Sequence, residues 1–241
     1  MHRCLQTTLL VASLAFPSAA FPSAALAEEE TPFVGGLGKA YVGGMALSVG
    51  GLEGSLRPHL GTDAAIGDLA AQVGGGGFAM IGGVVLAGGG YGVFVPTSDG
   101  AQGGVALGGG GGGVALGYAV VNTREWIVYP SFGVGGFGYT MTITNTGGSP
   151  ITLGSDDPIA TGEQADFDAG FLTVDMGISA NRLLFFGNGG FAVGLDAGFL
   201  TSVVSSNWEH GNAVADLLER ARLRGVYMRL TVGGGGFYFS E

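Results

Sequence analysis

The chain has 241 residues, of which 51 are glycine, and only 12% are Asp, Glu, Lys or Arg, whereas a water-soluble domain usually has about a quarter. Its formal net charge of -10 argues against a nucleic-acid partner, because binding to phosphates needs clustered positive charge. After the N-terminal region no segment offers the roughly 20 consecutive apolar residues of a spanning helix, which leaves a closed β-barrel as the way for so apolar a chain to cross lipid.

The first 27 residues differ from the rest because they contain no glycine. Met1–Arg3 is weakly basic, Leu5–Phe16 is mostly apolar, and Ala25-Leu26-Ala27 precedes three glutamates. This order is typical of a secretory signal peptide, so we expect residues 1–27 to be removed on export. The single cysteine, Cys4, lies inside this signal, which excludes a disulfide scaffold and a Cys-ligated metal site in the mature chain.

Residues 28–37 are interpreted as a short flexible leader, and residues 38–241 as a single barrel domain. About eight strand-like segments follow, at 39–49, 73–81, 84–95, 104–121, 126–144, 166–180, 191–204 and 224–239. They are joined alternately by long polar loops and short turns. The predicted loops are 52–72, 96–102, 145–165 and 206–223, and the predicted turns are 82–83, 122–125 and 181–188. This alternation predicts an all-β, closed antiparallel up-and-down transmembrane β-barrel with its long loops outside the cell.

Alternation of apolar and polar residues is clearest in the last three strands, where it assigns one face to lipid and one to the interior. The predicted lipid-facing residues there are Leu172, Val174, Met176, Ile178, Phe191, Val193, Leu195, Ala197, Phe199, Val226, Met228, Leu230 and Val232. In the first strand the same rule places Tyr41, Met45, Leu47 and Val49 outward, whereas the glycine-rich segments between 73 and 121 cannot be assigned a phase.

The glycine content has two readings. Inward-facing Gly and Ala would allow a narrow, strongly bent barrel wall, since eight strands leave little interior space. A silk-like or disordered glycine-rich protein is the alternative, which the interleaved Val, Leu, Phe and Tyr oppose. Two loop segments, 63–72 and 213–222, have apolar residues at helical spacing and are interpreted as short helices packed on loop neighbours or covering the barrel mouth.

The C-terminal strand carries a more specific pattern. Val232, Gly234, Phe237 and Phe239 form a Gly followed by alternating aromatic residues, although Ser240-Glu241 follow the last aromatic. In this the chain resembles small bacterial outer-membrane β-barrels of the eight-stranded OmpA and OmpX class, and the resemblance is architectural. It implies recognition of this strand by the barrel-assembly machinery. Phe237 and Phe239 share the parity of Arg229, so either a bulge resets the phase or the inward assignment of Arg229 is wrong.

Two groups of side chains are candidate sites. Asp175, Asp196 and Arg229 fall on the interior face of successive strands and are predicted to form a lumen ion-pair cluster, which is viable only if the charges are paired. A structural role is favoured over conduction. Trp126 and Tyr129 follow a short turn and are predicted to anchor the barrel at the membrane interface, with ordinary strand packing as the alternative.

The remaining candidate chemistry lies in the loops. His59 with Ser55, and His210 with Ser205 or Ser206, could form the pair of a lipid-modifying barrel enzyme, but no third orienting group is evident. Asp156, Asp157, Glu163 and Asp166 could bind Ca²⁺, but they lack the regular spacing of a dedicated site, and a solvated acidic loop is preferred.

We therefore expect a non-catalytic protein of the outer membrane of a Gram-negative-type bacterium, with a structural or surface-interaction role, no metal and no cofactor. Its expected partners are outer-membrane lipid and the assembly machinery, and the sequence identifies no ligand. An exported soluble or cell-surface glycine-rich β-protein is the alternative function class, and a lipid-modifying barrel enzyme is a third.

The first prediction is cleavage after Ala27. N-terminal sequencing of the exported protein should begin at Glu28, because the small residues of the Ala25-Leu26-Ala27 site fit the signal peptidase. An envelope form that retains Met1 would refute the assignment of the signal.

Overall fold

The computed structural model describes residues 32–50, 52–61, 69–153, 158–186, 189–210, 213–215 and 222–239. The predicted signal, 1–27, lies outside the described residues. Eight long strands run through the described part of the chain. They are β1 (Pro32–Gly50), β2 (Leu69–Ile81), β3 (Val84–Asp99), β4 (Gly103–Tyr118), β6 (Trp126–Asn145), β7 (Gln164–Phe186), β8 (Gly189–Ser205) and β11 (Arg222–Phe239).

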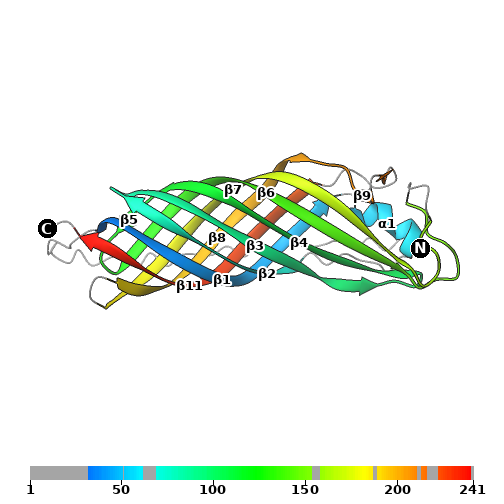
Figure 1. The fold of residues 1–241 in the computed structure, drawn as a ribbon, viewed down its shortest axis with the longest axis horizontal. Coiled ribbons are helices and arrows are strands. Elements are labelled where there is room, and N and C mark those ends of the chain that lie inside the picture. Colours follow the sequence, from blue (N-terminus) through cyan, green and yellow to red (C-terminus); the bar gives the residue numbers. More distant parts are fainter. Residues whose placement is uncertain are drawn as a thin grey trace, which may run out of the picture.

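These strands form a closed antiparallel barrel (Figure 1). Each pairs with its neighbour in the chain, and β1 pairs with β11 from Pro32↔Phe239 to Gly50↔Arg222, which closes the sheet. Three two-residue strands lie at the ends of the barrel. β5 (Val121–Asn122) pairs with β6. β9 (Glu209–His210) pairs with β7 and with β10 (Ala213–Val214). The predicted fold class is confirmed. The predicted alternation of long and short connections holds only in part, because the predicted loop between β3 and β4 is reduced to residues 100–102, whereas the predicted turn between β4 and β6 spans 119–125 and contains β5.

Some predicted boundaries differ from the structure. β1 begins at Pro32, so residues 32–37 belong to the barrel wall and not to the predicted flexible leader. β7 continues to Phe186, which places most of the predicted turn at 181–188 inside a strand. The turn at Gly82-Gly83 is as predicted, and both glycines have positive φ, 56° and 86°, which other residues rarely adopt.

The outer wall is apolar over a band that matches a bilayer. Along β6 the outward positions are apolar from Trp126 to Gly138 and then polar at Thr140. About 12 residue steps of roughly 3.3 Å, tilted by about 40°, give a band about 30 Å tall. On β7 the charged residues Arg182 and Asp168 pair with Trp126 and Thr140, so the same limits appear on the neighbouring strand.

The face assignments are confirmed for the last three long strands, whose residues Leu172, Phe191, Val193, Met228 and Leu230 are among the exposed apolar side chains. The assignment for the first strand is wrong. Met45 and Leu47 are buried in the interior, and Val42 is exposed on the outer wall. The reason is that the loop end of the interior is itself apolar, so hydrophobicity alone does not distinguish its two faces there.

Two apolar layers fill the barrel interior. The layer nearer the turns contains Leu37, Phe78, Met80, Val85, Ile127, Tyr129, Leu183 and Phe237. The layer nearer the loops is larger and includes Met45, Leu47, Val93, Leu107, Phe137, Met141, Ile143, Phe167 and Trp208. Together they leave a polar zone between them.

A helix, α1 (Leu52–Leu60), completes the layer nearer the loops and lies at the end of the barrel (Figure 1). Its Leu52, Leu56 and Leu60 are fully buried, since residues four apart share a helix face. Helices were instead predicted at 63–72 and 213–222, where the described residues form β2, β10 and the start of β11. None of the described helical residues belongs to a helix long and apolar enough to cross a membrane.

The inward glycines follow from interior crowding. A Cβ at Gly74 would lie 2.7 Å from the Tyr41 ring, and one at Gly198 would lie 2.5 Å from the Tyr227 hydroxyl. Other glycines approach the neighbouring backbone, since a Cβ at Gly89 would lie 2.6 Å from the Gly75 carbonyl oxygen. Glycine therefore makes room for aromatic side chains and for a strongly bent wall.

We predict that Leu230→Arg destabilises the barrel by about 2–4 kcal/mol, because it places a charge near the middle of the apolar band. Leu69→Arg is the matched control. Both leucines are exposed, but Leu69 begins β2 at the loop end, so its substitution should cost about 0–1 kcal/mol. Urea unfolding in lipid vesicles measures both, and equal costs would mean that the band is misplaced.

Candidate functional site: the mid-barrel cavity

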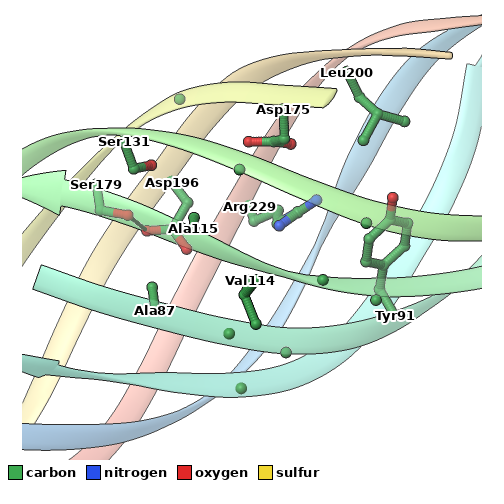
Figure 2. A pocket seen from close by; sticks show the side chains of 18 of the residues that line it. Ala87, Tyr91, Val114, Ala115, Ser131, Asp175, Ser179, Asp196, Leu200 and Arg229 are labelled. Carbon is green, nitrogen blue, oxygen red and sulfur yellow. Dashed lines mark hydrogen bonds between the residues drawn. The ribbon is translucent and has the colours of Figure 1, made fainter. Parts of the chain in front are cut away.

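Between the two apolar layers lies a cavity of about 140 Å³ with two dissimilar walls (Figure 2). One wall, from β1, β7, β8 and β11, carries the charged and hydroxyl side chains Lys39, Asp175, Ser179, Asp196, Tyr227 and Arg229. The opposite wall, from β2, β3, β4 and β6, is mostly glycine and alanine, including Gly76, Ala87, Gly89, Gly113 and Ala115. The space exists because the glycine wall projects almost nothing inward.

A salt bridge joins β1 to β8 across β11. Lys39 Nζ lies 3.1 and 3.2 Å from the two oxygens of Asp196, and Ser179 Oγ donates to Asp196 Oδ1 at 2.7 Å. The Lys39 and Asp196 side chains are 7% and 13% exposed, so water screens the pair little. Lys39 Nζ also lies 3.5 Å from Asn181 Oδ1.

The second charged group centres on Tyr227. Its hydroxyl donates to Asp175 Oδ1 at 2.9 Å, and the Arg229 guanidinium lies 3.9 Å from its ring centroid. Arg229 also lies over the rings of Tyr41 and Tyr91, at 4.9 and 5.0 Å, in cation–π geometry. Its Nε donates to Gln72 Oε1 at 2.7 Å.

The predicted cluster is therefore inside the barrel, but its pairing differs. Asp175, Asp196 and Arg229 all line the cavity, whereas the cation that neutralises Asp196 is Lys39, a residue absent from the prediction. The prediction missed it because residue 39 was taken as the first residue of a strand whose phase was then assigned the wrong way. Three buried nitrogen atoms, Arg229 Nη2, Gln72 Nε2 and Asn181 Nδ2, have no hydrogen-bond partner within the described part of the chain.

The C-terminal residues resolve the conflict in parity. β11 pairs with β1 without a bulge from Val34↔Tyr238 onward, so no phase change occurs. Val232 is exposed on the outer wall and Gly234 shares its parity, while Phe237 is buried in the layer nearer the turns. Phe237 and Arg229 thus both face inward. Phe239 ends β11 opposite Pro32, and recognition of these residues by an assembly machinery stays a prediction.

Of the two predicted interface aromatics, only Trp126 lies on the outer wall, with an exposed fraction of 41%. Tyr129 faces inward, is 2% exposed, and packs edge-on against Phe78 with centroids 5.3 Å apart. The outward aromatics near the turns are Tyr118, Trp126, Phe186, Phe191 and Tyr238, a distribution typical of an interfacial girdle.

The loop residues considered for catalysis are engaged in backbone contacts. Ser206 Oγ donates to the Asn207 carbonyl at 2.8 Å and accepts from Gly170 N, and His210 Nδ1 lies 2.7 Å from the Asp166 carbonyl. Ser55 and His59 lie on α1, and Ser205 ends β8. Asp156 and Asp157 lie outside the described residues, and within the described ranges no three His, Cys, Asp or Glu side chains are grouped to hold a metal ion.

No protein-family model and no curated protein matches the chain. Among solved structures, it is similar to Ail, the attachment invasion locus protein of Yersinia pestis, with 7% identity, 86% of this chain and 99% of that chain covered, and a TM-score of 0.41. It is also similar to the outer membrane protease OmpT of Escherichia coli, with 7% identity, 87% and 98% coverage, and a TM-score of 0.37. Likenesses this distant transfer neither protein's activity.

The architecture itself comes from the closed strand pairing and the apolar outer band. The chain folds as an eight-stranded barrel of the outer-membrane type. In this barrel one apolar layer lies on each side of the cavity along the lumen.

We predict that Lys39→Met destabilises the barrel by about 3–5 kcal/mol, because it leaves Asp196 charged and without its cation. The double variant with Asp196→Asn should recover most of this loss, since no unpaired charge then remains. A double-mutant cycle on urea unfolding gives the coupling between the two residues. Asp168→Asn, an exposed acid outside the lumen, is the control and should change stability by less than about 0.5 kcal/mol. Zero coupling between residues 39 and 196 would contradict the salt bridge.

Proposed function

We propose that this protein is a non-catalytic, non-conducting barrel of a bacterial outer membrane that presents a folded surface at the cell exterior. The observation that carries the proposal is the filled loop end. Described residues of α1 and of the loops pack into the larger apolar layer, which supports a filled platform without a pore at this end of the barrel. In outer-membrane barrels the longer loops face outward, which would place the platform outside the cell.

Hydrogen bonds tie three connections of the platform together. Gln102 N donates to the Leu60 carbonyl at the end of α1, and the Gln102 carbonyl accepts from Thr146 and Gly147. The buried Asn145 side chain donates to the carbonyls of Ser149 and Ile159, which holds the next loop in a defined shape. A preorganised loop surface loses less entropy on binding than a mobile one, which supports a surface-interaction role.

The topology and the absence of conduction are tested together. An epitope tag inserted after Gly148, an exposed loop residue, should bind antibody on intact cells, while a tag inserted between Gly82 and Gly83 should require permeabilisation. The purified protein should give no channel steps in a planar bilayer, because both apolar layers block the lumen. Labelling of the Gly82-Gly83 tag on intact cells, or regular conductance steps, would overturn the proposal.

The other function classes are tested separately. The protein should stay with outer-membrane fractions after carbonate extraction, whereas an exported soluble protein would be released. Incubation with phospholipid micelles should give no hydrolysis, since the Ser206 hydroxyl hydrogen-bonds the Asn207 carbonyl. Hydrolysis that His210→Ala abolishes would favour a lipid-modifying enzyme instead.

A further inference from the structure

Among the residues that the structure describes, the mid-barrel cavity contains one anion, Asp175, and one cation, Arg229, that form no salt bridge. Within the lumen cluster, Lys39 and Asp196 neutralise each other. Asp175 accepts a hydrogen bond from the Tyr227 hydroxyl through Oδ1. Arg229 is held by a hydrogen bond to Gln72 and by the rings of Tyr41, Tyr91 and Tyr227.

Both unpaired charges lie against one phenol ring. Asp175 binds the hydroxyl of Tyr227, and the Arg229 guanidinium lies 3.9 Å from the centroid of the same ring. Both side chains line the cavity, and in Figure 2 Asp175 and Arg229 lie across from Ala87 on β3. A small molecule in the cavity can therefore accept a hydrogen bond from the Arg229 guanidinium and donate one to the Asp175 carboxylate, since both groups contact the same tyrosine ring.

We propose that this cavity is a binding site for a small zwitterion of the amino-acid type, whose ammonium group binds Asp175 and whose carboxylate binds Arg229. Charge-assisted hydrogen bonds of this kind are the stronger class, and both Asp175 and Arg229 line the cavity. The ligand carries no net charge, as the four charged residues of the cluster together carry none.

The size and shape of the cavity agree with this ligand class. A buried cavity of about 150 Å³ is large enough for benzene, so about 140 Å³ accommodates a molecule of roughly five to eight non-hydrogen atoms. The glycine wall offers mainly backbone groups that are already hydrogen-bonded within the sheet, which suits the short methylene chain between the two charged ends. Specificity would therefore come from the charged wall.

The test uses amino acids of increasing length. Glycine, β-alanine and γ-aminobutyrate are each added at equal concentration while the full mature chain folds in detergent, so that entry into the closed lumen does not limit binding. Sodium acetate and methylammonium chloride, which carry one charged end each, are the comparison compounds. The midpoint of thermal unfolding is the readout, since a ligand of the folded state raises the midpoint.

Three variants locate the site. Asp175→Asn keeps an acceptor for Tyr227 but removes the charge, and should weaken binding of the preferred amino acid at least about tenfold. Ser131→Leu fills the cavity from β6 and should abolish binding. Phe132→Leu, the adjacent residue on the outer wall, is the control and should bind as the unsubstituted protein does.

Binding of at least one amino acid that is lost in Asp175→Asn and Ser131→Leu but kept in Phe132→Leu supports the site. No rise of the unfolding midpoint with any of the three amino acids overturns it. An equal rise of the unfolding midpoint in every variant also overturns it, because that is the general effect of an excluded osmolyte.

Discussion

The constraint on which the structure depends is the small interior of an eight-stranded barrel. Eight strands leave just enough room for inward side chains, so a large residue on one strand requires a small one beside it. Tyr227 is accommodated because Gly177 and Gly198 lie on the two preceding strands, where a Cβ would lie 2.8 and 2.5 Å from the Tyr227 hydroxyl. The many glycines and the inward aromatic side chains thus have the same cause, which is the small volume inside the barrel.

This limit also explains why the polar cavity lies beside a glycine wall. In β2, β3, β4 and β6, even a methyl group at many glycines would meet neighbouring backbone, as at Gly135, whose Cβ would lie 2.5 Å from the Gly112 carbonyl oxygen. Side chains from the opposite wall then extend into free space, and charges can be held there only with partners. The Lys39–Asp196 pair and the tyrosines around Arg229 supply those partners.

The fold could be predicted from the sequence because it depends on spacing. Loop and turn lengths and the alternation in 166–239 fix the number and direction of strands, and the structure agrees. The same rule could not predict which side chains of the first strand face the lumen. Met45 and Leu47 are apolar, but they pack in the apolar layer nearer the loops and not against lipid. Residues 52–60 were predicted to be part of a loop. Leu52, Leu56 and Leu60 have helical spacing, but Gly54 and Pro58 between them are weak helix formers.

The candidate site was predictable only in part, since pairing depends on register. Parity placed Asp175, Asp196 and Arg229 on the interior face, but which charges touch is decided by how far each strand slides along its neighbour. In the observed register Arg229 is directly opposite Asp196 on β8, yet the salt bridge of Asp196 is with Lys39, opposite Gly233 on β11. The Lys39 side chain extends past Gly233, which has no side chain, to contact Asp196 on the next strand. The residue directly opposite on the neighbouring strand therefore does not determine the partner of a charged side chain.

The enclosed charges in turn fix the register. A slip of one residue in β1 or β8 would move Lys39 or Asp196 from the lumen to the lipid face and bring an apolar neighbour inward. Either move places a charge in the bilayer, which is costly near its midplane. In the glycine-rich segments of β2, β3 and β4 the side chains offer little resistance to sliding, because most outward and inward positions there are alike. The polar zone is therefore where the sequence specifies one barrel among the several that its glycines would permit.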